Sequence, residues 1–464
     1  MIRLYTATLL ALLFVPVAAN ADTLREIYEL ALENDAQLKS AEATYLSGLE
    51  DRNLGMAGLL PQISASYEYT NSDTDVDSPN IDTDNSGGFT VINTSTNIDT
   101  DTTGYNLSLR QPLFDMAAWF QFKTGSMSSR AAEATFAADQ QNLIVRVAEA
   151  YFTVLGAQDD LSSAEAQETA FQRQLEQTQQ RFEVGLIAIT DVHEARAGFD
   201  LAVVTRLTAE NILGVAMEDL EVLTGQGHSD LFRLKEDYPI ASPAPTDRSA
   251  WVDFALANNY SLEAARRNAE SARLNAKSAK AGHYPTISAV VNVSDMETDG
   301  DRTQNPPAIF NVPPDQNTEN TTIQFRLDMP LYSGGAVSAQ RRQAYQSYNA
   351  VRENFVSLQR NTVRNTRSLH LTINTDVARV AARRQGITSS QSALDATQAG
   401  YEVGTRNIVD VLNAQNQLFT SQRDYANSRY DYVVNMLRLK QQAGQLSPGD
   451  INDINTWLEA AATR

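Results

Sequence analysis

The sequence contains no cysteine in 464 residues, which excludes disulfides, thiolate metal sites and cysteine nucleophiles. Histidine is scarce as well, and no two histidines have a zinc-binding spacing such as H-E-x-x-H. We expect the four to be isolated surface or interface residues: His193, His228, His283 and His370. No P-loop, G-x-S-x-G or G-x-G-x-x-G motif occurs. The sequence therefore predicts a protein that is not an enzyme and needs no cofactor or metal.

Positive charge is also in short supply, since Lys and Arg number 37 against 57 Asp and Glu, a formal net charge of −20. Such an acidic chain is a poor candidate for binding nucleic acid. Long apolar runs are missing too, apart from the N-terminal MIRLYTATLLALLFVPVAANA. This segment has the features of a secretory signal peptide, so we expect the mature chain to begin at Asp22, with no cysteine there for lipid attachment. Any later entry into a membrane must use strands.

The chain contains an internal repeat. FEVGLIAITDVHEA at 182–195 recurs imperfectly as YEVGTRNIVDVLNA at 401–414. Gly185 and Gly404 suit the position just past a helix end, where a positive φ is cheap only for glycine. We expect the polar residues that follow to cap the next helix: Thr190, Asp191, Thr405 and Asn407. Each copy thus predicts a tight turn between two helices.

Four short segments alternate between apolar and polar residues, with the period of a β-strand. They lie at about 61–70, 103–112, 285–294 and 322–331. Each is about as long as a transmembrane strand, although a half-buried sheet in a soluble protein gives the same pattern. The strands share the repeat, because Pro-Gln-Ile-Ser-Ala at 61–65 matches Pro-Thr-Ile-Ser-Ala at 285–289.

Between the paired strands lie Asn71 to Thr103 and Asp295 to Asn320, which are rich in Asp, Asn, Thr and Ser. We interpret both as exposed loops with little capacity to form a core. Calcium binding is the weaker alternative, since the EF-hand spacing is absent.

The rest of the chain is predicted to be helical. Proline is absent from Met116–Phe182 and Gly335–Arg406, and apolar or small residues recur every seventh position, which favours coiled-coil packing. Shorter helical stretches are expected at Leu24–Gly58, Asp191–Gly225, Trp251–Gly282 and Asp410–Gly444. The predicted organisation is a signal peptide (1–21), a first repeat (22–225), a linker (226–249), a second repeat (250–445) and a C-terminal tail (446–464).

Four strands cannot close a barrel, yet a bilayer requires every backbone polar group to be paired. A membrane barrel must therefore combine several copies of the chain: two copies would give eight strands, three would give twelve. A barrel continued by long helices would be a duct. The alternative is a secreted coiled-coil stalk or adhesin without a pore, which explains the helices but not the strands.

The segments RFEVGLIAITDVHEARA (181–197), HYPTISA (283–289), MPLYSGG (329–335) and AGYEVGTRNIVDVLNAQ (399–415) resemble those of the TolC family of outer-membrane efflux and secretion ducts. The resemblance covers nearly the whole mature chain, including its duplication. It implies a homotrimer that joins a twelve-stranded β-barrel in the outer membrane to an α-helical barrel in the periplasm. It also implies a passive duct for drug efflux or type I secretion. Its partners would be a periplasmic adaptor, an inner-membrane pump of the RND, ABC or MFS type, and outer-membrane lipid.

The resemblance further implies a gate at the periplasmic tip. Its links would match Thr190 and Asp191 of the first repeat with Tyr401 and Arg406 of the second. Asp410 matches one acidic ring that narrows the pore, whereas Asn413 stands where relatives carry a second aspartate. The adaptor would dock at the helix-turn tips, at Val184, Gly185, Val403 and Gly404. The alternative is that these residues only cap and pack the helical hairpins.

Overall fold

A computed structural model describes residues 22–83, 87–307 and 310–460, so the expected signal peptide at 1–21 lies outside the described residues. The described chain forms two compact units. The first comprises 22–45, 134–263 and 356–460, and the second comprises 46–133 and 264–355. Among the described helices, none combines the length and the apolar character needed to span a bilayer.

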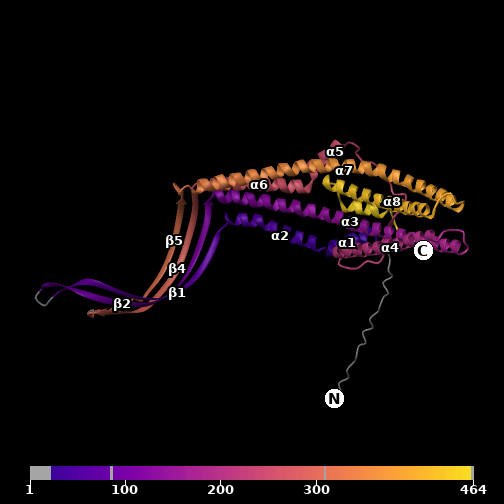
Figure 1. The fold of residues 1–464 in the computed structure, drawn as a ribbon. Helices are drawn as coiled ribbons and strands as arrows, with labels where there is room; N and C mark the ends of the chain where they lie inside the picture. Colours follow the sequence, from indigo (N-terminus) through magenta and orange to yellow (C-terminus); the bar gives the residue numbers. More distant parts are fainter. Residues whose placement is uncertain (1–21, 84–86, 308–309, 461–464) are drawn as a thin grey trace, which may run out of the picture. The chain divides into compact units, whose positions relative to one another are not determined.

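Two helices are exceptionally long: α3 (Met116–Glu183) has 68 residues and α7 (Ala336–Glu402) has 67, close to the predicted spans (Figure 1). Their seven-residue pattern shows in the burial: seven of its eleven positions are buried, namely Leu143, Ala157, Ala164, Phe171, Ile373, Val380 and Leu394. The other four, Phe136, Ala150, Ile387 and Tyr401, are half-buried. The other main helices are α1 (Leu24–Asn34), α2 (Ala36–Ala57), α4 (Ile189–Thr224), α5 (Arg248–Asn258), α6 (Tyr260–Ala281) and α8 (Ile408–Gln442).

Two of the shorter stretches, each predicted as one helix, are broken. The break falls at Asp35 in the first repeat and at Asn259 in the second, both with extended backbone. In each case the side chain accepts a hydrogen bond from the backbone N–H three residues on, Leu38 at 3.0 Å and Leu262 at 2.9 Å. A side-chain oxygen that caps a new helix N-terminus competes with the continuing helix, so the chain restarts there.

The second unit contains a four-stranded antiparallel sheet in the order β1-β2-β4-β5. Its strands are β1 (Gln62–Thr83), β2 (Phe89–Phe114), β4 (Thr286–Asn305) and β5 (Gln316–Asp328). The register aligns the predicted apolar positions: Ile63 pairs with Leu109, Leu109 with Val291, and Val291 with Ile323. Residues directly opposite one another share a face, so the four strands present one continuous apolar row.

The regions predicted as loops are largely strand, and that prediction was wrong. β1 runs on to Thr83, and β2 already begins at Phe89. Their polar side chains bond across the ladder, as where the Asn97 amide donates to Asp73 at 2.7 Å and to Asp75 at 2.9 Å. A ladder of this kind is held by backbone and cross-strand bonds and needs no buried core. Residues 84–86 and 308–309 lie outside the described part.

The first unit has the larger core, and it gathers distant parts of the chain. Leu24, Leu231 and Leu458 are all buried in it. A short strand in the predicted linker, β3 (Arg233–Leu234), pairs with β6 (Leu458–Glu459) of the predicted tail, and α9 (Pro448–Asn455) precedes β6. Neither short strand had been predicted. Tyr151, fully buried, donates its hydroxyl to the Phe232 carbonyl at 2.7 Å and so ties α3 to this linker.

Candidate functional site

Both repeat motifs form the same helix ending. Gly185 has φ +74° and Gly404 has φ +80°, as predicted. The following amide reaches back to close the last turn, from Leu186 to the Arg181 carbonyl and from Thr405 to the Gly400 carbonyl, each at 2.9 Å. This is the Schellman arrangement, which satisfies carbonyls that a helix end otherwise leaves unpaired. The two hairpins α3–α4 and α7–α8 therefore turn in equivalent ways.

The predicted caps hold only in part. Asn407 caps α8 as expected, since its side chain accepts from the Asp410 amide at 2.9 Å while Asp410 accepts from the Asn407 amide at 3.3 Å. In the first repeat the helix begins earlier, with Ala188 as N-cap and no side-chain bond. Thr190 and Asp191 thus lie inside the first turn of α4, where a carboxylate still favours the helix dipole.

Thr405 does not cap α8 either. Its hydroxyl donates backward to the Gly400 carbonyl at 3.0 Å and so stabilises the end of α7. Thr405 therefore caps the C-terminal end of α7 and not the start of α8, because the turn places its hydroxyl over the Gly400 carbonyl.

Tyr401 occupies the centre of this tip. Its side chain packs against two small cores, one around Phe171 and Ile408 and the other around Leu394 and Val411. The Arg181 guanidinium lies over its ring at 5.1 Å from the centroid, a cation–π contact that joins α3 to α7. The Tyr401 hydroxyl is buried and has no hydrogen-bond partner among the described residues. Buried polar groups are rarely left without a hydrogen-bond partner, so this unpaired hydroxyl is unusual.

The other predicted gate residues are close to the turns but not bonded to Tyr401. The Arg406 guanidinium lies 3.8 Å from the Asp410 carboxylate, and the Thr190 hydroxyl lies 3.4 Å from the Asp191 carboxylate. Within the described chain no hydrogen bond or ion pair connects the Thr190–Asp191 pair with Tyr401 or Arg406. The gate links between Thr190 or Asp191 and Tyr401 or Arg406 therefore stay a prediction.

Arg181 was missed as a candidate, although it opens the repeat motif of the first half. A polar groove of about 400 Å³ beside it is lined by Gln174, Gln177 and Gln180 of α3 and by Gln398 and Glu402 of α7. The spacing of three residues between the glutamines places them on one helix face, a signal that the sequence does contain.

The tips of both turns are apolar and exposed. Val184 is 70% exposed, Leu186 72% and Val403 76%. Asn413 is exposed as well, whereas Asp410 is partly shielded by its role in the cap. Exposed valine and leucine at the end of a helical hairpin offer apolar contacts to another protein.

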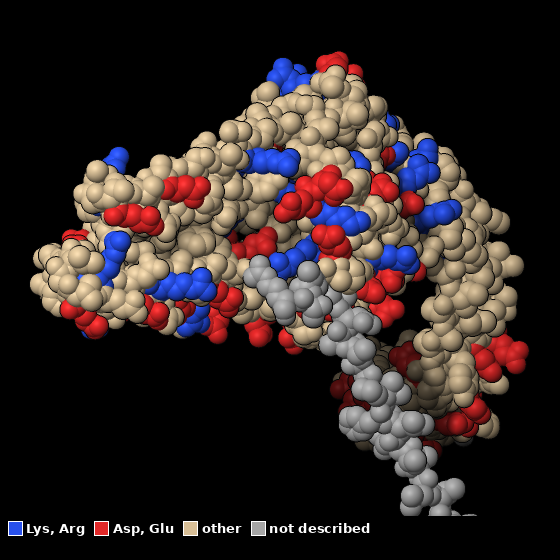
Figure 2. All heavy atoms as spheres, turned by 90° about the vertical axis from the view of Figure 1, so that its right-hand side faces the viewer, with Lys and Arg blue, Asp and Glu red and all other residues tan. Residues whose placement is uncertain are grey.

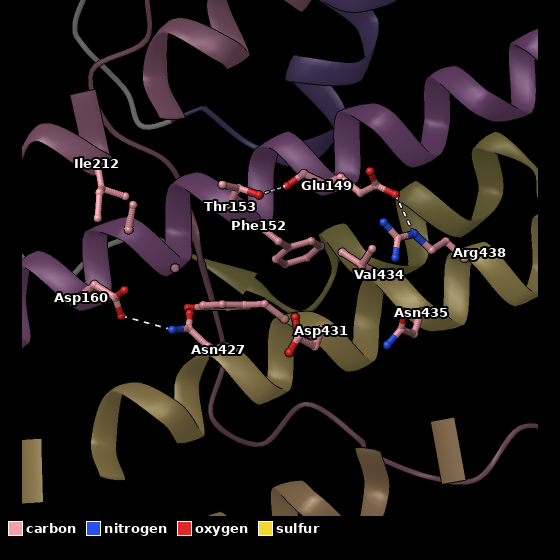
Figure 3. A pocket seen from close by; sticks show the side chains of 13 residues that line it. Glu149, Phe152, Thr153, Asp160, Ile212, Asn427, Asp431, Val434, Asn435 and Arg438 are labelled. Carbon is pink, nitrogen blue, oxygen red and sulfur yellow. Dashed lines mark hydrogen bonds and ion pairs between the residues drawn. The ribbon is translucent and has the colours of Figure 1, made fainter. Parts of the chain in front are cut away.

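A separate hollow of about 410 Å³ lies between α3 and α8 in the first unit (Figure 3). Phe152 and Val434 line its apolar part, and the Asn427 amide donates to the Asp160 carboxylate at 3.2 Å. Burial raises the pKa of both the Asp160 and the Asp431 carboxyl above the ordinary value.

The raised pKa of Asp431 predicts a pH-dependent cost to stability. Below the ordinary value of 3.8 the carboxyl is protonated in both folded and unfolded chains, so no cost arises. As the pH rises from there through the raised folded pKa, the unfolded chain loses its proton first and the folded state is progressively disfavoured. Asp431→Asn should therefore raise the melting temperature at pH 7 and have no effect near pH 3.5, measured by thermal unfolding of the detergent-purified protein.

A matched control for that experiment is Asp219→Asn, which removes the same charge from an exposed position of α4. An identical, pH-independent shift in both variants would contradict the assignment to burial.

The histidine expectation was right for His193 and His283, which are exposed, and wrong for the other two. His370 is buried, and the His228 ring bonds the Asp22 carboxylate at 2.7 Å and the Thr224 hydroxyl at 2.8 Å. In the described residues no cluster of metal-ligating side chains occurs. Acidic and basic side chains are interspersed over the face shown in Figure 2.

A sheet with an exposed apolar row, joined to helices of nearly 70 residues, is typical of an outer-membrane channel protein. The chain belongs to the outer membrane efflux protein family, whose model matches residues 27–226 and 251–445. It is an outer-membrane protein, and its family consists of efflux channels rather than enzymes.

Individual relatives support the same family assignment. The outer membrane protein TolC of Vibrio cholerae serotype O1 is 35% identical over 443 residues, covering 95% of each chain. The alkaline protease secretion protein AprF of Pseudomonas aeruginosa is 30% identical over 426 residues, covering 91% of this chain and 85% of AprF. The crystal structure of the outer membrane protein VceC from Vibrio cholerae shares the fold, with a TM-score of 0.73, 18% identity, and coverage of 91% of this chain and 96% of VceC. The family resemblance is thereby confirmed, and the chain is a channel for efflux or secretion; no comparison supports the stalk or adhesin.

Proposed function

We propose that three copies of this chain form a passive duct that crosses the outer membrane as a twelve-stranded β-barrel and extends into the periplasm as an α-helical barrel. The observation that carries the proposal is the sheet. Among the described residues, its two outer strands, β1 and β5, each pair with one neighbour in the order β1-β2-β4-β5. In a bilayer such edges must be paired, and further copies of the same chain supply the missing strands.

The apolar band on the sheet supports a membrane position. On β4 its apolar positions run from Ile287 to Val293, roughly 20 Å at the rise of a strand, most of the roughly 25 Å height of the lipid-facing band of outer-membrane barrels. Large apolar side chains in it are exposed in the single chain, as at Ile63 (67%), Phe325 (76%) and Leu327 (65%). The rings of Tyr67 and Tyr105, 4.9 Å apart, lie at one end of the band, as expected of an aromatic girdle.

The helical tips supply the rest of the proposal. We assign the closed gate to Tyr401 and Arg406 with Thr190 and Asp191, linked when copies assemble, and the acidic constriction to Asp410. A periplasmic adaptor docks on the exposed Val184 and Val403 and couples the duct to an inner-membrane pump. The cargo is set by that pump. Protein secretion is one candidate because AprF is named for it.

Single-channel recording tests the proposal. The detergent-purified mature protein should give a small, steady, cation-preferring current in a planar bilayer. Asn413→Asp should increase the preference for cations, because it adds a second ring of carboxylates in the pore. Asp219→Asn serves as an unrelated charge change and should leave selectivity unchanged. A folded oligomer that conducts no current would overturn the duct.

A further inference from the structure

A groove in the second unit has a chemistry unlike the rest of the chain. It lies between α6 and α7, has a volume of about 530 Å³, and is lined by five cationic side chains: Arg273, Lys277, Lys280, Arg341 and Arg342. Tyr345 and Tyr348 complete it, their rings 6.2 Å apart. We refer to these seven residues as the basic groove.

The positive charge of the basic groove is largely uncompensated. Neither 271–294 nor 329–352 contains an Asp or a Glu, although acidic residues outnumber basic ones by 57 to 37 in the whole chain. Arg273 pairs with Glu270 at 2.5 Å. Over the described part of the chain, the other four cations form no ion pair, and Lys277 instead lies over the Phe120 ring at 5.9 Å. Four uncompensated cations in one groove favour an anionic occupant.

The basic groove is adjacent in the chain to the ends of the membrane strands. Lys280 precedes the start of β4 at Thr286 by six residues, and Arg341 follows the end of β5 at Asp328 by thirteen. The short connections between carry exposed Tyr284 (43%) and Tyr332 (88%). Tyrosine exposed beside the end of a membrane strand is typical of the lipid–water interface.

The internal repeat does not explain these cations. At the matching positions the first half carries Leu49, Asn53 and Met56 on α2 and Lys123 and Thr124 on α3. Glu50 and Asp51 are present there as well. Of the five cations, only Arg341 matches a basic residue of the first half, Lys123. The basic groove is therefore a feature of the second half alone.

We propose that the basic groove binds the phosphate of an anionic phospholipid from the periplasmic leaflet of the outer membrane. The guanidinium groups of Arg341 and Arg342 and the ammonium groups of Lys277 and Lys280 bind the headgroup oxygens. The Tyr345 and Tyr348 rings contact the glycerol and the start of the acyl chains. This inference rests on the proposed membrane position of the strands, because only there does the groove meet a lipid headgroup.

The test measures lipid binding by the delipidated, detergent-purified oligomer with native mass spectrometry. The probes are phosphatidylglycerol and phosphatidylcholine of equal chain length. The wild-type protein should retain phosphatidylglycerol in preference to phosphatidylcholine. Arg341→Gln with Arg342→Gln should weaken that binding by at least about tenfold, since each cation near an anionic headgroup contributes measurably. Arg341→Lys with Arg342→Lys should keep most of it.

The matched control is Lys123→Gln with Arg130→Gln, which removes the same charge from exposed positions near the start of α3. It should leave phosphatidylglycerol binding unchanged. Equal losses in both double variants, or equal retention of the two lipids by the wild type, would overturn the site. Inorganic phosphate or water-soluble glycerophosphoglycerol that binds as tightly as the intact lipid would overturn the lipid assignment in favour of a free-anion site.

Channel recordings separate this inference from the proposed function. Conductance by the Arg341→Gln, Arg342→Gln variant should equal that of the wild type, since the gate and the constriction are untouched. A wild type that binds phosphatidylglycerol but conducts nothing would refute the duct and leave the lipid site standing.

Discussion

Tyr401→Phe combined with Arg406→Ala should raise the resting current of the channel by about tenfold, the effect of removing roughly 1.4 kcal/mol from the closed state. This free energy is the sum expected for two lost interactions, a partly exposed ion pair of Arg406 and a hydrogen bond of the Tyr401 hydroxyl. Tyr401 forms no hydrogen bond through its hydroxyl within the described chain, so Phe loses no contact that the isolated fold depends on. The loss falls on the assembled, closed tip. Planar-bilayer recording without adaptor measures it.

Two controls accompany the gate variant. Its melting temperature should match that of the wild type, because the Tyr401 ring and its packing against Ile408 and Leu394 remain. Tyr260→Phe with Arg364→Ala makes the same chemical changes on exposed helix surfaces away from the turns and should leave the current at the wild-type level. An unchanged resting current in the Tyr401, Arg406 variant would refute the gate.

Arg146→Met should strongly destabilise the first unit. Arg146 forms an ion pair with Asp35, whose side chain is only 4% exposed. Removing the cation leaves a buried carboxylate without its counter-charge, which costs about 3–5 kcal/mol of unfolding free energy. Denaturant unfolding of the purified protein should show the loss as a lower midpoint.

The second substitution in this experiment separates charge from packing. Asp35→Asn keeps a side-chain oxygen to cap the helix that begins at Ala36, so Arg146→Met with Asp35→Asn should recover most of the stability. Arg25→Met breaks the exposed pair between Arg25 and Glu29 and should cause no measurable loss. A double variant as unstable as Arg146→Met alone would show that the contact matters for packing rather than for charge.

Much of this fold was predictable because local rules decided it. Gly185 and Gly404 adopt the left-handed conformation that a helix end requires, and the alternation of the short segments matches the apolar row of the sheet. Most of the heptad positions are buried for the same reason, since a period close to the helical repeat leaves one face apolar.

The errors arose where partners distant in sequence decide the structure. The polar extensions of β1 and β2 are strands because Asn97 bonds Asp73 across the ladder, and composition alone cannot reveal such a register. The pairing of β3 with β6 and the position of Arg181 over Tyr401 likewise depend on residues more than 200 positions apart. The breaks at Asp35 and Asn259 were local, but a single capping residue competes with a strong helical pattern.

The core shared by Leu24, Leu231 and Leu458 has a consequence for biogenesis. These three leucines lie more than 200 residues apart along the chain. The first unit therefore cannot complete its core until residue 458 has been synthesised and exported. Contacts of such sequence separation form slowly, because a long loop must close before they contribute. The unfinished chain meanwhile exposes α1 and the linker, which makes the interval between export and closure the period of greatest vulnerability to aggregation and proteolysis.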